Sequence, residues 1–211
     1  MARPEVPTLK TPSVKTLHHA EYPAISPLRP ELSKAGKTVL IAGGSTGIGF
    51  AIARAFVRAK AARVILLGRR EAVVKESAAK LAAEVGDKTT STTTTIIPLV
   101  CDVVDLAESA KLWDSLKKDG IFVDVLVLNA ATFGEPKPIL EAGLASVWGA
   151  FEVNVRMPLD FAERFHKQQV GGGRGGRQKV SLVSLTCQCH CSVVARDGKG
   201  RKDVANIVEC Q

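Results

Sequence analysis

The feature that most constrains this chain is a regular alternation of short apolar runs with longer amphipathic stretches. The apolar runs are rich in Val, Ile and Leu and fall at residues 37–44, 63–68, 95–103, 123–131 and 179–185. Apolar residues recur at helical spacing in residues 50–62, 71–86, 106–120 and about Leu144 to His166. Strands that are apolar on both faces and separated by helices form a parallel sheet covered on both sides. The sequence therefore predicts an α/β fold, a doubly wound parallel sheet of Rossmann type with about five strands.

Proline and charge divide the chain into three parts. Six of the ten prolines lie in residues 1–30, and proline fixes φ and removes backbone donors, so residues 1–35 are expected to form an extended arm. Residues 36–185 hold the predicted sheet. Residues 164–211 contain nine Lys or Arg against three Asp or Glu, within a formal net charge of +8. Because residues 186–211 show no amphipathic period, they are expected to form a divergent basic tail.

The longest apolar runs, such as residues 123–131, fall far short of the ~20 residues that span a bilayer. The N-terminus lacks the apolar core of a signal peptide. Five cysteines are an odd number, and only three lie close together, which does not resemble a secreted disulfide framework. We therefore expect a soluble cytoplasmic protein without a membrane partner.

The first predicted strand ends in the glycine-rich turn "AGGSTGIG", residues 42–49. A turn between a strand and a helix, at the start of a βαβ unit, is the context in which glycines approach a pyrophosphate. Glycine permits positive φ, and the following helix start presents its N–H groups to the anion. The sequence predicts a dinucleotide-binding turn made by Gly43, Ser45, Thr46, Gly47, Ile48 and Gly49.

The end of the second predicted strand bears on which nicotinamide cofactor this turn would hold. An acidic residue there usually meets a free ribose 2′-hydroxyl, whereas a 2′-phosphate favours a cation. Here the strand ends with Gly68, Arg69 and Arg70, and the first carboxylate is Glu71. Arginine binds phosphate well because its planar guanidinium group donates several hydrogen bonds. We expect NADP(H) rather than NAD(H), the alternative being that both arginines only begin a solvated helix.

Four motifs in this order resemble those of the short-chain dehydrogenases/reductases, over residues 37–185. They are the glycine turn, "CDV" at 101–103, "LNAA" at 128–131 and "FEVNV" at 151–155. The resemblance implies that Asp102 contacts adenine, that Asn129 and Ala130 lie beside the cofactor, and that Asn154 holds a water in a proton relay. It also implies hydride transfer between a nicotinamide and a small carbonyl or alcohol substrate, whose identity the sequence does not specify.

The catalytic group of that family is incomplete in this chain. The family uses a Ser at the end of the fifth strand, a Tyr about thirteen residues later and a Lys four after the Tyr, which lowers the phenol pKa. Ser184 is the candidate serine, although Leu185 aligns better with the family's position. The only tyrosine is Tyr22, and no Tyr-x-x-x-Lys occurs. We therefore expect a C-terminally truncated or divergent member with weak or no activity, or a non-catalytic cofactor-binding pseudoenzyme or interaction protein.

Two short segments raise other hypotheses. "CQCHC" at 187–191 offers zinc-type ligands, but four ligands in five residues cannot easily surround one ion, so we predict no metal site. "GGGRGGR" at 171–177 resembles RNA-binding repeats, yet it holds two arginines and no aromatic residue, which favours a flexible loop over a nucleic-acid partner. The family usually dimerises through the long helix and the helix that follows it, so the resemblance makes Ala150 to Phe165 a candidate homo-oligomer interface, while the sequence leaves the oligomeric state open. Pro158 is expected to kink the long helix.

Overall fold

The computed structural model describes residues 20–85, 94–134, 137–171 and 181–184. Within these ranges lies one five-stranded sheet in the order β3-β2-β1-β4-β5, with every pairing parallel. The strands are β1 Thr38–Ala42, β2 Arg63–Gly68, β3 Thr95–Val100, β4 Val125–Leu128 and β5 Ser181–Ser184. The predicted doubly wound parallel sheet is confirmed. Each strand falls inside an apolar run, and the runs extend at most three residues past a strand into the following loop.

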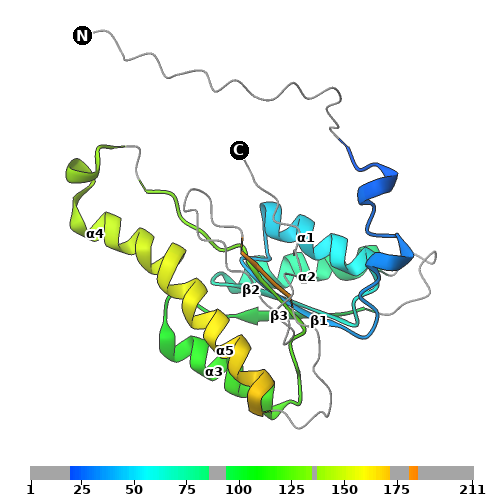
Figure 1. The fold of residues 1–211 in the computed structure, drawn as a ribbon. Coiled ribbons are helices and arrows are strands. Elements are labelled where there is room, and N and C mark those ends of the chain that lie inside the picture. Colours follow the sequence, from blue (N-terminus) through cyan, green and yellow to red (C-terminus); the bar gives the residue numbers. More distant parts are fainter. Residues whose placement is uncertain (1–19, 86–93, 135–136, 172–180, 185–211) are drawn as a thin grey trace, which may run out of the picture.

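The helices connect successive strands and cover both faces of the sheet (Figure 1). Two short 3-10 turns, Pro23–Ile25 and Pro30–Leu32, precede β1. The longer helical elements are α1 Gly47–Arg58, α2 Glu71–Val85, α3 Leu106–Lys118, α4 Ile139–Phe151, the π-helical segment Glu152–Arg156 and α5 Met157–Gly171. None of the helices within the described ranges combines the length and the apolar character that crossing a bilayer would need.

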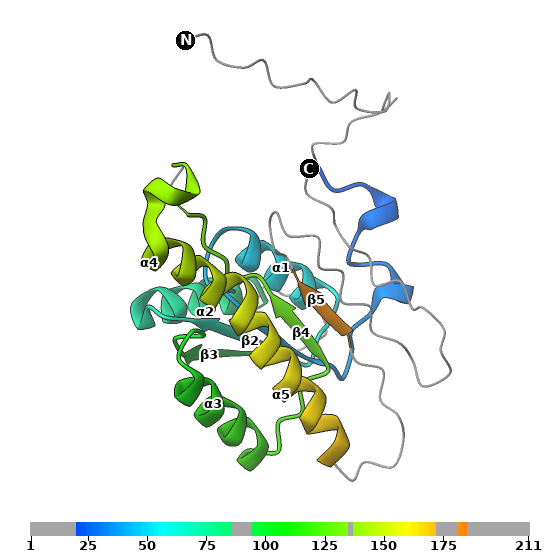
Figure 2. The same cartoon turned by 60° about the vertical axis from the view of Figure 1, so that its left-hand side comes forward.

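Alternate residues of the central strands form two separate cores, because successive strand side chains point to opposite faces. On one face Leu40 and Ile65 pack with Trp113 of α3 and Phe161 of α5. On the other face Val39, Ile41 and Val64 pack with Ala53 of α1 and with Val74 and Leu81 of α2. Figure 2 shows α3 and α5 together on one side of the sheet, with α1 and α2 on the other. The two buried faces explain why these strands have almost no polar positions.

The long helix predicted from about Leu144 to His166 is confirmed at its start and continues five residues further, to Gly171. A short helical stretch from Ile139 precedes it, beyond a break at Gly143. Gly143 has φ +78° and ψ 158°, a conformation that only glycine adopts readily. A π-helical turn, Glu152–Arg156, ends two residues before Pro158, where the sequence predicts a kink. Because Pro158 has no N–H to donate into the preceding turn, an irregular turn at this place is the expected response of the backbone.

The N-terminal residues that the structure describes contact the end of α1. The backbone N–H of Lys34 donates to the carbonyl oxygen of Ala59 at 2.7 Å, and Arg58 of α1 forms an ion pair with Glu21. The division into an arm at 1–35, a domain at 36–185 and a tail at 186–211 stays a prediction. Residues 1–19 and 185–211 lie outside the described part of the chain.

Candidate functional site

The glycine turn lies between the carboxyl ends of β1 and β4, where the order of the strands reverses. Gly43 has φ +74°, and a Cβ atom there would come within 2.9 Å of the Cα of Ala130. A Cβ atom at Gly49 would lie 2.1 Å from the carbonyl oxygen of Gly43. Neither position accepts a larger residue without moving the backbone. These two glycines therefore allow α1 to begin close against the sheet.

Gly47 is the third glycine of the motif, and its surroundings differ. It begins α1 with φ +55°, and a Cβ atom there would have no neighbour within 4 Å among the described residues. Thr46, Gly47 and Ile48 are exposed, and the Thr46 side chain caps none of the first N–H groups of α1. The start of this helix thus presents N–H groups and open space together, which is the arrangement that anion binding needs.

Asn129 holds the turn from the neighbouring strand. Its side-chain amide donates to the carbonyl oxygen of Gly43 at 2.9 Å. The backbone N–H groups of Asn129 and Ala130 both approach the carbonyl oxygen of Ala42, at 3.1 and 2.9 Å. The structure thus brings four of the predicted residues, Gly43, Gly49, Asn129 and Ala130, into direct contact.

Ser45 and Arg69 are brought near one another by the end of β2. A Cβ atom built at Gly68 would lie 3.1 Å from Oγ of Ser45. Arg69 follows Gly68 and is exposed. Ser77 of α2 donates its hydroxyl proton to the carbonyl oxygen of Ser45 at 2.6 Å. The sequence analysis did not predict a role for Ser77. The sequence marks it only as a polar residue between Val74 and Ala78, which are buried.

Asp102 lies in the loop between β3 and α3 and is half-buried. Its Oδ1 accepts a hydrogen bond from the N–H of Val104 at 3.1 Å, and its own N–H donates to Glu108 at 2.7 Å. In the described part of the chain, no hydrogen bond joins Asp102 to the glycine turn. The preceding Cys101 is buried, and burial, with a smaller contribution from Glu108, raises the pKa of its thiol to about 11. This thiol is therefore neutral at physiological pH and is not a nucleophile.

Asn154 lies in the π-helical segment and forms two hydrogen bonds with the loop that follows β4. Its Oδ1 accepts from the N–H of Thr132 at 3.0 Å, and its amide donates to the carbonyl oxygen of the same residue at 2.8 Å. Sequence reasoning did not single out Thr132, which lies 22 residues away in the chain. Beside Asn154 is a pocket of about 250 Å³ lined mainly by apolar residues of α4 and the π-helical segment, among them Val147, Ala150, Phe151 and Val155.

Ser184 is the last residue of β5 and pairs in register with Leu128 of β4. The strand end that carries it therefore lies at the same edge of the sheet as the start of the Asn129 loop. Within the described ranges there is no group of three or more His, Cys, Asp or Glu side chains suited to a metal ion. The segments at 187–191 and 171–177 that suggested zinc or RNA lie outside those ranges, apart from the backbone of Gly171.

A doubly wound parallel sheet with a glycine turn at its switch point, between β1 and β4, defines a dinucleotide-binding α/β domain. A family model described as short chain dehydrogenase matches residues 37–187. The chain is 31% identical over 151 residues to the short chain dehydrogenase/reductase AacuD of Aspergillus aculeatus, covering 72% of this chain and 49% of that protein. It is also 31% identical over 170 residues to a sorbitol dehydrogenase of Cereibacter sphaeroides, covering 76% and 61%.

Among solved structures, a metagenomic short-chain oxidoreductase in complex with NADP has the same fold. Its TM-score is 0.60 at 22% identity, covering 72% of this chain and 61% of that one. The chain belongs to the short-chain dehydrogenase family, whose members bind a nicotinamide cofactor. It spans about half the length of the first curated relatives that it matches, between 48% and 51% for most of them.

Proposed function

We propose that this protein binds NADP(H) and derives from an oxidoreductase that moves hydride between nicotinamide and a small carbonyl or alcohol. The observation that carries this proposal is the glycine turn at the switch point, with Gly43 and Gly49 packed too closely for any side chain. The residues fit the cofactor: the start of α1 is open, and Asn129 fixes the turn from β4. When bound, the cofactor would supply or accept the hydride, and the protein's part is to hold and orient it.

The preference for NADP(H) rests on the charge at the end of β2. Arg69 and Arg70 are exposed, and neither forms an ion pair within the described residues. The nearest carboxylate in sequence, Glu71, is held by Lys75 at 2.6 Å one helical turn along α2. This pair lowers the pKa of Glu71. A 2′-phosphate at this strand end would thus meet two available guanidinium groups, and the NADP-bound relative of the same fold supports that choice.

Substitution of Arg69 tests this assignment. Arg69→Ser is expected to weaken NADPH binding about tenfold or more while leaving NADH within about twofold, because only NADPH carries the 2′-phosphate. Arg63→Ser is the matched control, since Arg63 is an exposed arginine at the opposite end of the same strand. Titrations of both variants with each cofactor give the comparison. Equal losses for NADPH and NADH in Arg69→Ser would refute a 2′-phosphate contact.

We further propose that this chain has weak or no turnover by itself, despite binding the cofactor. Asn154 contacts the loop after β4, and Ser184 ends β5 at the same edge of the sheet, but no Tyr-x-x-x-Lys pair occurs in the sequence to exchange the proton. General acid–base catalysis contributes typically about 10²–10⁴-fold to such a step. NADPH consumption with a panel of ketones and aldehydes is expected to stay at least about a hundredfold below that of a family member with the pair. A rate within tenfold of that enzyme would contradict this expectation. NADPH binding without measurable turnover would favour a cofactor-binding pseudoenzyme.

An apolar stripe supports a homo-oligomer. Leu144, Trp148, Phe151, Val155 and Leu159 recur at intervals of three or four residues after the break at Gly143, along α4, the π-helical segment and α5. Leu144 is 81% exposed, Trp148 60% and Leu159 64%. A row of large apolar side chains at helical spacing is typical of a helix that packs against another one. We propose that the stripe pairs with its own copy in a second chain.

A further inference from the structure

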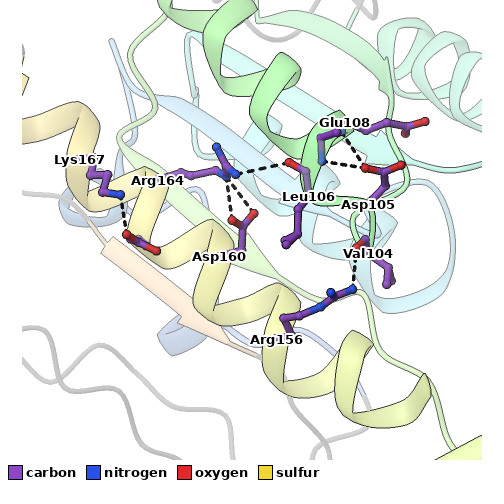
Figure 3. Close-up of polar contacts among 10 residues, drawn as sticks. Val104, Asp105, Leu106, Glu108, Arg156, Asp160, Arg164 and Lys167 are labelled. Atoms are coloured by element: carbon purple, nitrogen blue, oxygen red, sulfur yellow. Dashed lines mark hydrogen bonds and ion pairs between the residues drawn. The ribbon is translucent and has the colours of Figure 1, made fainter. Parts of the chain in front are cut away.

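The π-helical segment Glu152–Arg156 contacts two loops at the carboxyl edge of the sheet at the same time. Asn154 makes both of its side-chain hydrogen bonds to Thr132, in the loop after β4. Two residues further on, Arg156 donates from Nη2 to the carbonyl oxygen of Val104 at 3.0 Å, in the loop after β3. Figure 3 shows the Arg156 side chain reaching from its helix to that loop. One short segment therefore connects loops on either side of the central strands.

The loop that Arg156 reaches is the one that carries Asp102. The N–H of Val104 donates to Oδ1 of Asp102, so the residue held by Arg156 through its carbonyl oxygen holds Asp102 through its N–H. Asp102 and Arg156 are thus joined by a single intervening residue. A displacement of Val104 would move the Asp102 carboxylate with it.

The rest of this loop is anchored at both ends. Toward β3, the N–H of Cys101 donates to the carbonyl oxygen of Gly68, next to Arg69. Toward α3, Asp105 accepts from the N–H groups of Ala107 and Glu108, which lower the pKa of its carboxyl group.

Arg164 of α5 contacts the first residue of α3, directly after this loop. It donates to the carbonyl oxygen of Leu106 at 3.4 Å, while both oxygens of Asp160 accept from its Nε at 2.9 Å. Figure 3 shows Arg156 and Arg164 on the same side of their helical segment, both directed at the loop. Between the two fixed ends, Arg156 is the side chain that acts on Val104.

We propose that Arg156 is a positioning residue for the adenine end of the cofactor site, acting through Val104 on Asp102. This inference rests on the proposed binding of NADP(H), with Asp102 at the adenine. Arg156 touches neither the cofactor nor the reacting atoms. Its carbonyl-directed hydrogen bond sets the place of Val104, and thereby keeps the Asp102 carboxylate beside the strand end that carries Arg69. Loss of the guanidinium removes one hydrogen bond from the Val104 carbonyl oxygen, while the Val104 side chain stays packed against the core. The backbone that carries Asp102 is then held less firmly, and the adenine contact weakens.

The test uses 2′,5′-ADP, the adenine half of NADP with its 2′-phosphate, and the full-length chain. Arg156→Gln is expected to raise the dissociation constant of 2′,5′-ADP about five- to tenfold, the size of one ordinary hydrogen bond. Arg156→Lys keeps a donor and is expected to restore binding to within about twofold. Lys167→Gln is the matched control, because Lys167 lies in the adjoining α5 and its ion pair among the described residues is an exposed one with Glu163.

A double-variant cycle separates positioning from a loss of stability. In an Asp102→Ala background, Arg156→Gln is expected to leave the 2′,5′-ADP dissociation constant unchanged within about twofold, because the side chain being positioned is gone. Unchanged binding in Arg156→Gln, a full effect in the Asp102→Ala background, or failure of Arg156→Lys to restore binding would each overturn the inference. If the unaltered protein binds neither NADPH nor 2′,5′-ADP, the proposed function itself fails.

Discussion

At the scale of single residues, the glycines of the turn after β1 are required for different reasons. Gly43 and Gly49 are packed against backbone atoms, so a substitution there would disturb the fold and the site together. Gly47 has free space around it and only its positive φ to constrain it. It is therefore the position at which cofactor binding can be separated from folding.

Gly47→Ala is expected to destabilise the fold by about 1 kcal/mol, because an L-residue at positive φ is strained by roughly that amount. Its Cβ atom would also occupy the open space at the start of α1, so NADPH binding should weaken about tenfold or more. Gly120→Ala is the matched control, since Gly120 has φ +66° and no neighbour within 4 Å of its Cβ position. Urea unfolding and NADPH titration measure the two effects. Equal loss of NADPH affinity in both variants would contradict a phosphate contact at Gly47.

Residues with a local motif could be predicted from the sequence, while residues acting through distant partners could not. Gly43, Gly49 and Asn129 belong to short motifs whose spacing follows from the strand–turn–helix geometry, and the structure brings them together. Thr132 and Arg156 have no such signal, because their partners lie 22 and 52 residues away. Such contacts form between loops that the order of the strands brings side by side.

At the scale of elements, strands could be predicted more closely than the long helix. The run at 63–68 coincides with β2, Arg63–Gly68, because both faces of a central strand are buried and polar residues mark its ends. Between Leu144 and His166 the apolar period is nearly regular and predicts a helix, in which Pro158 alone predicts a kink. The break at Gly143 and the π-helical turn before Pro158 depend on the backbone of single residues. The spacing of apolar residues indicates a helix but not such local irregularities.

The apolar stripe on α4 and α5 gives a prediction at this scale. Trp148→Glu is expected to convert the protein from a dimer to a monomer, because a charge in the middle of the stripe would be buried without a partner. Ile25→Glu is the control, since Ile25 is a similarly exposed apolar residue, at 55%, in the N-terminal turn Pro23–Ile25. Light scattering after size-exclusion chromatography measures the mass. A monomeric unaltered protein, or a Trp148→Glu dimer, would refute pairing through the stripe.

At the scale of the whole molecule, the described sheet has the parallel order of a short-chain dehydrogenase, and the residues predicted to bind its cofactor follow the ends of successive strands. The strand order β3-β2-β1-β4-β5 places the glycine turn, Arg69, Asp102 and Asn129 along one edge, after β1, β2, β3 and β4 in turn. Every one of these residues is supplied by the loop that follows its strand, which is where ligands of open α/β sheets bind. The chain as a whole is therefore expected to behave as an NADP(H)-binding domain, whatever its turnover.

Titration of the purified protein with NADPH and, separately, with NADH tests this most directly. Nicotinamide fluorescence reports binding of either reduced cofactor. We predict saturable binding of one NADPH per chain, with a dissociation constant at least about tenfold lower than that for NADH, because Arg69 and Arg70 would contact the 2′-phosphate. Failure of both cofactors to bind would show that the glycine turn and its neighbours do not form a cofactor site.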